Sequence, residues 1–264
     1  MATLKAFFTT LVYQPLFNLL FWFVAVLPGE SLGLGIIALT IVVRILLLPA
    51  SAAAVKSQRE MAALQPKIDE IRSKHAAKPE EMNQKLLAVY QEHKVNPFGS
   101  CLPLLIQLPI LWVLYQVFWG GIHATNFDLL YHFVPRPEAL QTTLVGIDLA
   151  KPSLVLAVIA GALQFLQTWQ LLKRTQQTKD RTKLPASEKK ATPEASKLAQ
   201  STSNQTMYLM PLFTVFISAT LPSALAVYWA VTTAFSILQQ WYLIRTQPAL
   251  PHHHVAVTVR KKRT

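Results

Sequence analysis

The sequence is poor in charge and in cysteine, and both shortages exclude classes of protein. Only 14% of its 264 residues are charged whereas 52% are hydrophobic, which is not the composition of an ordinary soluble domain. Cys101 is the single cysteine, so an intrachain disulfide and a cysteine-rich metal site are excluded. The sequence also has no phosphate-binding glycine loop and no HExxH or GxSxG motif. We therefore expect neither an enzyme nor a bound cofactor or metal.

Acidic residues are missing from the apolar runs. The chain has several runs of about 20 apolar residues, the length that crosses a bilayer, and they predict a polytopic all-α membrane protein. None of the five expected spans contains Asp or Glu. A proton- or sodium-coupled pump normally needs such carboxylates, and no inverted repeat is visible either. No small-residue cleavage site follows the first apolar region, so we expect no removable signal peptide.

One basic residue, Arg44, does lie inside an apolar run, Gly33–Ala54. An arginine at the centre of a spanning helix costs about 2.5–3.5 kcal/mol on insertion scales. One interpretation is that Arg44 snorkels to an interface or that the span ends early. The other is a water-accessible polar site within the membrane.

The distribution of positive charge predicts the orientation of the chain. Of the 25 Lys and Arg, eight lie in 56–98, eight in 173–205 and five in 244–264. The connections expected on the other side, 28–32 and 121–151, hold only Arg136 and Lys151. This asymmetry follows the positive-inside rule and places the C-terminus in the cytoplasm. The net charge of +12 therefore indicates topology and anionic lipids before nucleic acid, and we expect no DNA binding.

The expected organisation has ten segments. They are an N-terminal amphipathic or interfacial helix (1–32), a first span (33–55), a cytoplasmic helical hairpin (56–98), a second span (99–120), an extracytoplasmic loop (121–151), a third span (152–172), a disordered cytoplasmic loop (173–205), a fourth span (206–222), a fifth span (223–243) and a basic cytoplasmic tail (244–264). Residues 6–27 could span the membrane or lie flat in its interface, and we favour the interface.

The hairpin rests on two short apolar periodicities on either side of Lys78-Pro79. They comprise Met61, Leu64, Ile68, Ile71 and His75, then Met82, Leu86, Val89 and His93. Six acidic residues accompany its eight basic ones, so its surface is mixed in charge. It is either a solvated spacer or a docking arm for a partner or for lipid headgroups.

Polar residues recur at helical spacing in three of the later spans. The third carries Gln164, Gln167 and Thr168, the fourth carries Thr214 and Ser218, and the fifth carries Trp229, Thr232, Thr233, Ser236 and Gln240. Such groups either join packed membrane helices or line a shared hydrated cavity, which would give Arg44 a polar setting. In the tail, His252–His254 point in different directions and do not predict a metal site, and Arg260–Arg263 suit anionic lipid or ribosomal RNA or simply mark topology.

Several motifs in succession resemble the YidC/Oxa/Alb membrane protein insertases. They are IIALTIVVRILLLP, LQPKIDEIRSKH, NPFGSCLPLLIQLPI, GALQFLQ, MYLMPLF and LPSALAVYWAVTTAFSILQQ, and they cover about residues 5–245. The resemblance is to the short bacterial members, although Gly99-Ser100-Cys101 stands where the family more often has Gly-Gly-Cys. It implies five core transmembrane helices around a hydrophilic groove that opens to the cytoplasm of a bacterial inner membrane.

The resemblance also implies groove residues and partners. Arg44 matches the family's groove arginine, with Gln167 and Trp229 next and with Thr40, Gln164, Thr233 and Ser236 as further lining. Nascent membrane proteins are the implied substrates, and the ribosome, the signal recognition particle receptor, the Sec translocon and anionic lipids are candidate partners. Two other functions stay open from the residues alone. One is a small-anion transporter or channel with Arg44 as its selectivity site, and the other is a membrane scaffold that presents the hairpin.

Overall fold

The computed structural model describes residues 7–76, 78–93, 95, 102–119, 127–181 and 208–246, and these are mostly helical. This confirms the expected all-α class. The α-helices are α2 (Gln14–Val26), α3 (Leu32–Leu46), α4 (Leu48–Lys74), α5 (Pro79–Glu92), α6 (Leu102–Trp119), α7 (Leu154–Arg181), an unnumbered helix (Tyr208–Thr220, here the Tyr208 helix) and α9 (Ser223–Thr246). Short elements add η1 (Thr9–Tyr13), η2 (Pro28–Glu30), η5 (Phe127–Leu129) and the strands β1 (Thr143–Leu144) and β2 (Ile147–Asp148).

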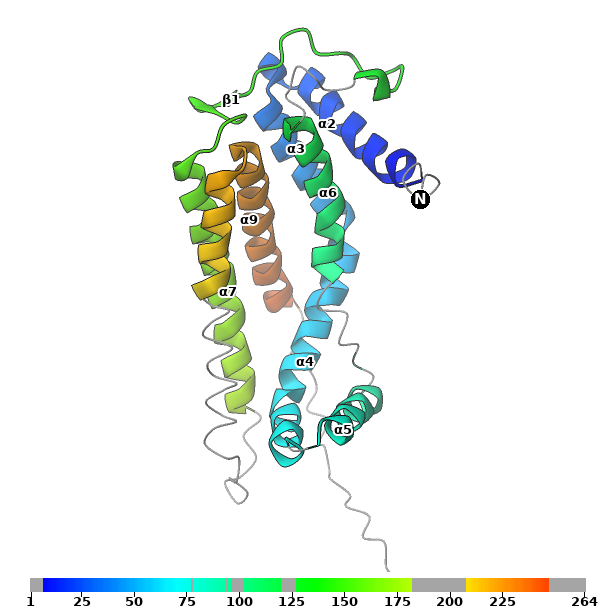
Figure 1. The fold of residues 1–264 in the computed structure, drawn as a ribbon, viewed down its shortest axis with the longest axis vertical. Helices are drawn as coiled ribbons and strands as arrows, with labels where there is room; N and C mark the ends of the chain where they lie inside the picture. Colours follow the sequence, from blue (N-terminus) through cyan, green and yellow to red (C-terminus); the bar gives the residue numbers. More distant parts are fainter. Residues whose placement is uncertain are drawn as a thin grey trace, which may run out of the picture.

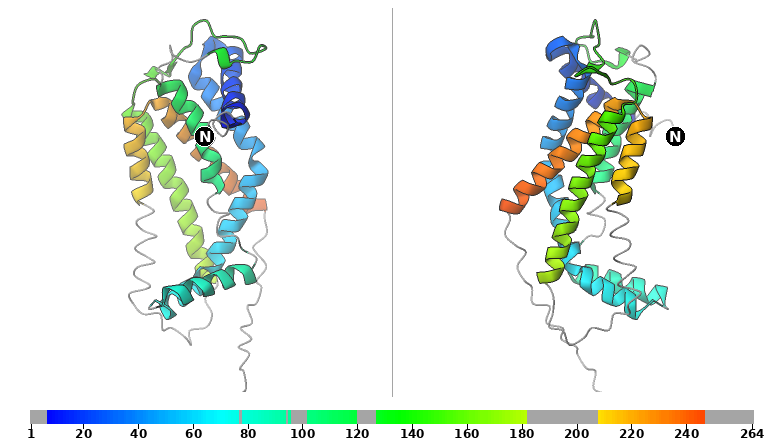
Figure 2. Two further views of the ribbon diagram at one scale, coloured as in Figure 1. Left: turned by 45° about the vertical axis from the view of Figure 1, so that its right-hand side comes forward. Right: turned by 90° about the vertical axis from the view of Figure 1, so that its left-hand side faces the viewer.

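The long helices run along one axis between two distinct ends (Figure 1). At one end lies the cap loop, residues 127–151, and at the other lies the hairpin of α4 and α5. Helix α9 is central, because it packs against α7, α3 and α6. Figure 2 shows that α9 runs obliquely to α7 as both helices leave the cap end. The polar residues of α9 therefore meet side chains from three other helices.

The first core span is broken rather than continuous. We expected one span over 33–55, but α3 ends at Leu46, α4 begins at Leu48, and the two helices are bent by 66°. Pro49 explains the break, because proline donates no backbone hydrogen bond and its ring clashes with the carbonyl four residues earlier. Thr9–Val26 and Leu154–Lys173 are long and apolar enough to cross a membrane, and the bent pair would be a third such span. Gln107–Val117 and Tyr208–Thr220 are shorter apolar helices, so five complete spans remain a prediction.

The helix that contains the third span continues beyond the membrane segment expected from the sequence. We expected disorder from residue 173, but α7 is helical as far as Arg181. This part of the prediction was wrong because a helix that already exists grows through Lys, Arg and Gln without needing an apolar face. The rest of the expected disordered loop, 182–205, lies outside the described residues, as does the tail beyond Thr246.

The cap loop is tied to three helices by hydrogen bonds. Asn18 on α2 is 3% exposed, and its amide donates to the Leu129 carbonyl at 2.9 Å and accepts from the Tyr131 N–H at 2.5 Å. The Leu32 N–H at the start of α3 donates to the Gln141 carbonyl at 2.9 Å. At the start of α9 the Ala224 N–H donates to Leu149 at 3.1 Å. The loop is therefore an ordered part of the bundle that holds the ends of these helices together.

The hairpin has its own small apolar core. It is formed by Leu64, Ile68, Leu86, Val89 and Val95, in agreement with the two periodicities in the sequence. Its surface charges pair locally, for example Lys67 with Glu92 at 3.4 Å. A hydrogen bond from Lys85 lowers the pKa of Glu81. The described charged side chains of the hairpin are therefore mixed in sign and pair with one another.

Gly161 permits a close contact between α7 and the Tyr208 helix. A Cβ atom there would collide with the side chain of Val215 on the Tyr208 helix and would lie 3.4 Å from the Pro211 carbonyl oxygen. Valine is β-branched and stiff, so it cannot rotate away freely. Ala157 and Ala160 beside Gly161 are fully buried, which is the small-residue packing typical of membrane helices.

We expect Gly161→Ala to destabilise the protein by about 1–3 kcal/mol, the usual cost of overpacking a close contact. The measurement is the thermal unfolding midpoint of the purified protein in detergent. Val158→Ala on the same helix is the matched control, because Val158 is 52% exposed. A midpoint for Gly161→Ala equal to that of the control would show that the two helices are not packed as described.

Candidate functional site

Arg44 lies at the break in the first core span. It occupies the last turn of α3, three residues before Leu47. The unpaired carbonyls at a helix C-terminus carry partial negative charge and favour a cation there. The bend therefore gives the guanidinium a favourable backbone field that an unbroken span would lack. It supplies part of the compensation that a buried charge requires.

The side-chain partners of Arg44 are neutral. Its Nη2 donates to Oε1 of Gln107 on α6 at 3.3 Å. The Tyr228 side chain of α9 is 1% exposed and interacts electrostatically with Arg44. Arg44 makes no ion pair with Asp or Glu within the part of the chain that the structure describes. The site is thus a single positive charge held by polar groups from three helices.

The Tyr228 hydroxyl lies close to the polar side chains of Gln107 and Thr232. It is buried but makes no hydrogen bond of good geometry among the described residues, and the same is true of the Thr232 hydroxyl. Buried hydroxyls without partners are costly, because the lost hydration is not replaced. These two groups, next to a cation, are suited to water molecules or to a polar ligand.

Thr40 lies one helical turn from Arg44 but its hydroxyl is already used. It is 1% exposed and donates to the Ile36 carbonyl of its own helix at 2.6 Å. A bond of this kind satisfies a hydroxyl inside a membrane helix and leaves only acceptor capacity. Thr40 therefore supports the packing around Arg44 more than it offers a donor to a ligand.

Gln164 and Trp229 form a second polar contact, between α7 and α9. The Trp229 Nε1 donates to Oε1 of Gln164 at 3.2 Å. The hydroxyl of Thr168, one turn along α7, donates to the backbone carbonyl of Gln164 at 2.9 Å. The structure thus brings two of the sequence-predicted residues together. Gln167 on the same helix is half-buried.

The polar face of α9 continues towards the hairpin end. Thr233 is 2% exposed, and Ser236 is half-buried and donates to the Thr232 carbonyl at 2.9 Å. Three glutamine side-chain atoms in this region are buried without a described partner. They are Gln170 Oε1, Gln239 Nε2 and Gln240 Oε1. Since buried amides normally have partners, water or a polar ligand is needed to satisfy them.

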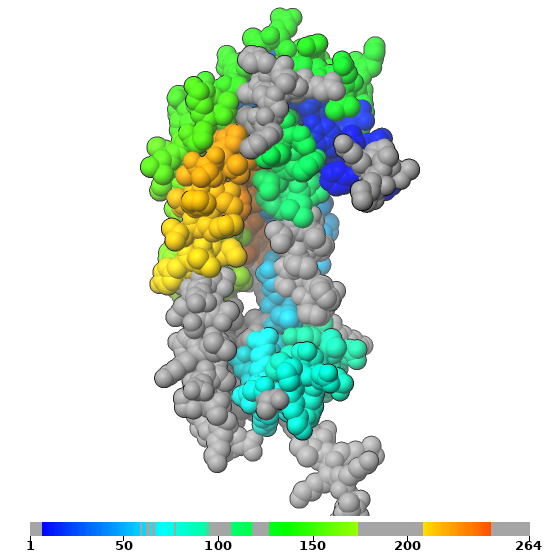
Figure 3. All heavy atoms as spheres, in the orientation of Figure 1, coloured from blue at the N-terminus to red at the C-terminus, as the bar shows by residue number. Residues whose placement is uncertain are grey.

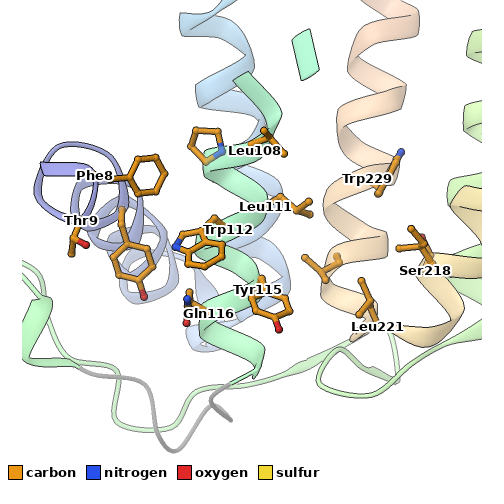
Figure 4. A pocket seen from close by; sticks show the side chains of 14 residues that line it. Phe8, Thr9, Leu108, Leu111, Trp112, Tyr115, Gln116, Ser218, Leu221 and Trp229 are labelled. Atoms are coloured by element: carbon orange, nitrogen blue, oxygen red, sulfur yellow. The ribbon is translucent and has the colours of Figure 1, made fainter. Parts of the chain in front are cut away.

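A cavity of about 1170 Å³ lies along α9, nearer the cap end. Figure 4 shows its lining, which comes from η1, α6, the Tyr208 helix and α9. Trp229 reaches this cavity, whereas Arg44, Gln164 and Thr233 do not line it. Leu225, Trp229 and Thr232 recur at i, i+4 and i+7, so the cavity continues the polar face of α9 towards the cap end.

Sequence reasoning identified Arg44 but not all of its partners. Gln107 and Gln116 are nine residues apart, so only one of them could face Arg44, and the structure selects Gln107 while Gln116 lines the cavity. Tyr228 was missed because tyrosine counts as apolar in a hydropathy pattern. Its place beside Trp229 on the polar helix was the only available signal.

No group of three or more metal-ligating side chains occurs among the residues that the structure describes. The histidines at 252–254 lie outside them. Among the described side chains near Arg44, no nucleophile is paired with a base. The arrangement can therefore hold water, polar backbone or an anionic group.

Comparison with known proteins assigns the family. Residues 6–249 match the model of the 60Kd inner membrane protein family. A protein of Fusobacterium nucleatum named membrane protein insertase YidC is 31% identical over 236 residues, which cover 87% of this chain and 97% of the relative.

Two further relatives have the same name but differ in length. Membrane protein insertase YidC of Maridesulfovibrio salexigens is 32% identical, and the match covers 89% of this chain but 38% of the relative. Membrane protein insertase YidC 1 of Listeria monocytogenes is also 32% identical, with 88% of this chain and 70% of the relative covered. The family match spans all the elements described above, and on this evidence the chain belongs to the 60Kd inner membrane protein family, the family of the YidC insertases that its motifs resemble.

Proposed function

We propose that this chain is a membrane protein insertase of the bacterial inner membrane. In this proposal it moves short polar segments of nascent membrane proteins across the bilayer and releases their apolar helices into lipid. The observation that carries the proposal is Arg44, a half-buried cation in an apolar helix whose described partners, Gln107 and Tyr228, are neutral and include no carboxylate. The names of the relatives agree with it.

The physical task sets what the site must do. A polar segment that crosses a bilayer meets a hydrocarbon core of about 30 Å, where each unsatisfied backbone group costs several kcal/mol. A hydrated groove that reaches the middle of the membrane would shorten this barrier. The buried polar atoms along α7 and α9 support such a groove, because they need water or a polar chain as a partner. The groove is lined in this proposal by Arg44, Thr40, Gln164, Gln167, Trp229, Thr233 and Ser236, with Gln107 and Tyr228 added.

Arg44 would act by attraction and not by chemistry. Its positive charge favours acidic or carbonyl groups of the arriving segment, although water in the groove screens the attraction. With no acidic partner, the charge is not neutralised before the substrate arrives. The apolar helix of the substrate can then leave sideways into lipid, and no bond is made or broken and no nucleotide is needed.

In this proposal the hairpin, the 173–205 segment and the C-terminus lie in the cytoplasm, as the distribution of Lys and Arg predicts. The hairpin would then meet the substrate or its delivery machinery, for which the ribosome, the signal recognition particle receptor and the Sec translocon are candidates. Its charge-balanced surface favours protein contacts over anionic lipid, which the basic 244–264 tail suits better.

Reconstitution in liposomes tests the function directly. The purified protein is assayed for insertion of a short single-span substrate and, in parallel, for flux of a small anion. Insertion without flux supports an insertase, whereas flux without insertion would indicate a transporter with Arg44 as its selectivity site. If neither occurs, a scaffold that presents the hairpin becomes the better interpretation.

We expect Arg44→Ala to lower insertion of a substrate with an acidic leading segment by about tenfold or more. This is the change that loss of a charge-assisted contact produces. Arg44→Lys keeps the charge and should retain much of the activity. The measurement is the initial rate of insertion at matched protein levels. Full activity of the alanine variant would contradict the electrostatic part of the proposal.

We expect Gln107→Leu to reduce insertion by about threefold to tenfold, because Arg44 then loses its described hydrogen-bond acceptor. Gln116→Leu is the matched control, since it makes the same change on the same helix away from Arg44. The measurement is again the initial rate in liposomes. Equal rates for the two variants would show that the Arg44–Gln107 contact has no part in insertion.

Cysteine accessibility tests the topology. In a Cys101→Ser background, single cysteines are placed at Lys5 and Glu30 and exposed to an impermeant maleimide from outside the cell. The interfacial interpretation of residues 6–27 predicts that both positions react. Reaction at Glu30 alone would instead show that the segment spans the membrane, which its length and composition allow.

A further inference from the structure

We propose that the cavity between η1, α6, the Tyr208 helix and α9 is a binding site for a membrane phospholipid. The ligand's acyl chains would fill the apolar part and its ester groups would meet the polar residues near the cap end. The cavity shares Trp229 with the proposed groove, but the inference is tested separately from the insertase function, because lipid labelling is measured without insertion of a substrate.

The cavity opens on a face of the molecule that is rich in exposed apolar side chains. Leu108 and Trp112 at its edge are 52% and 48% exposed, and Phe8 is 38% exposed. In Figure 3 the Tyr208 helix and α6 lie on this face with a recess between them. In a bilayer such a face meets lipid, so hydrocarbon chains are the most concentrated molecules at the opening.

The lining has a polarity gradient that matches a lipid. No Asp, Glu, Lys or Arg occurs among the described residues that line the cavity. Tyr115 and Gln116 lie in the part of α6 nearest the cap loop, and Leu108 lies at the far end (Figure 4). Leu108 precedes the end of α6 at Trp119 by about 16 Å of helix. The apolar part therefore points into the membrane and the polar part towards its surface.

Ser218 is the group that most specifically needs a ligand. It is 2% exposed and lines the cavity, and its hydroxyl has no hydrogen-bond partner among the described residues. It precedes the end of the Tyr208 helix at Thr220 by two residues, about 3 Å of helix rise. This depth is close to the boundary of the hydrocarbon core, where the ester carbonyls of a phospholipid lie and can accept a hydrogen bond.

The length of the cavity favours lipid chains over a transmembrane helix. The lining residues of α6, Leu108 to Gln116, cover about 12 Å of helix, close to the thickness of one leaflet. A complete spanning helix is about 30 Å long and would extend well beyond this lining. The acyl chains of one leaflet match its length.

Photolabelling of the full-length protein tests the site. The protein is reconstituted in vesicles of phosphatidylethanolamine and phosphatidylglycerol with a trace of phospholipid that carries a diazirine on its acyl chain. After illumination, labelled residues are mapped by mass spectrometry. We expect the label to concentrate on Leu108–Gln116 and around Ser218, several-fold above the exposed face of α7 at Leu154, Val155 and Val158.

Three variants make the test specific. Leu111→Trp should fill the cavity and remove most of its label, whereas Leu212→Trp, the same change at a side chain that is 66% exposed and does not line the cavity, should not. Ser218→Ala should lower cavity labelling by about fivefold, the effect of losing one neutral hydrogen bond, and Ser218→Thr should restore it. Labelling of α7 is the internal control for folding and reconstitution.

Two outcomes would overturn the proposal. One is labelling of the cavity residues that does not exceed that of α7 or does not respond to Leu111→Trp. The other is capture of a photoreactive apolar single-span peptide by the same residues with no labelling by lipid, which would assign the cavity to helices instead.

Discussion

The cost of holding one guanidinium among apolar helices is the constraint on which the rest of this structure depends. Arg44 is not neutralised by a carboxylate in the described part of the chain, so weaker sources of compensation must combine. The break after Leu46 places the charge at a helix C-terminus, and Gln107 and Tyr228 bring polar groups from α6 and α9. Each contribution needs a different helix in a fixed position. The positions of the helices around α9 and the polar environment of Arg44 therefore depend on each other.

The two ends of the bundle differ in how their helices are held in position. At the cap end, backbone hydrogen bonds and Asn18 join the loop to the starts of α3 and α9 and to α2, which fixes the helices near one another. Close packing at Gly161 adds a rigid contact between α7 and the Tyr208 helix. Towards the hairpin end, α7 and α9 carry buried amide atoms without partners. A bundle whose helices are tied together by hydrogen bonds at one end, and which carries buried amide atoms without described partners towards the other, is suited to admit polar material from one side.

The sequence predicted the features that depend on local pattern and missed those that depend on how helices meet. The apolar runs, the hairpin periodicity and the lone Arg44 could all be read along the chain, and the structure contains them. The bend at Leu47 follows from Pro49, but its consequence for Arg44 appears only once α3 is seen to end there. The choice of Gln107 over Gln116 requires the rotation of α6 about its axis, which hydropathy does not specify. The hydropathy pattern did not reveal Tyr228, because its ring is apolar and only its hydroxyl contributes to the site.

Two levels along one face of α9 differ in polarity. Tyr228, Thr232 and Thr233 lie towards the Arg44 site, where the Tyr228 and Thr232 hydroxyls without described partners favour water. Nearer the cap end, Leu225 lines a cavity with no charged side chain among its described lining residues, where hydrocarbon is favoured. Trp229 touches both, since its Nε1 donates to Gln164 while its ring reaches the cavity. A substrate with a polar leader and an apolar helix needs both kinds of surface within one helix diameter, and α9 places them there.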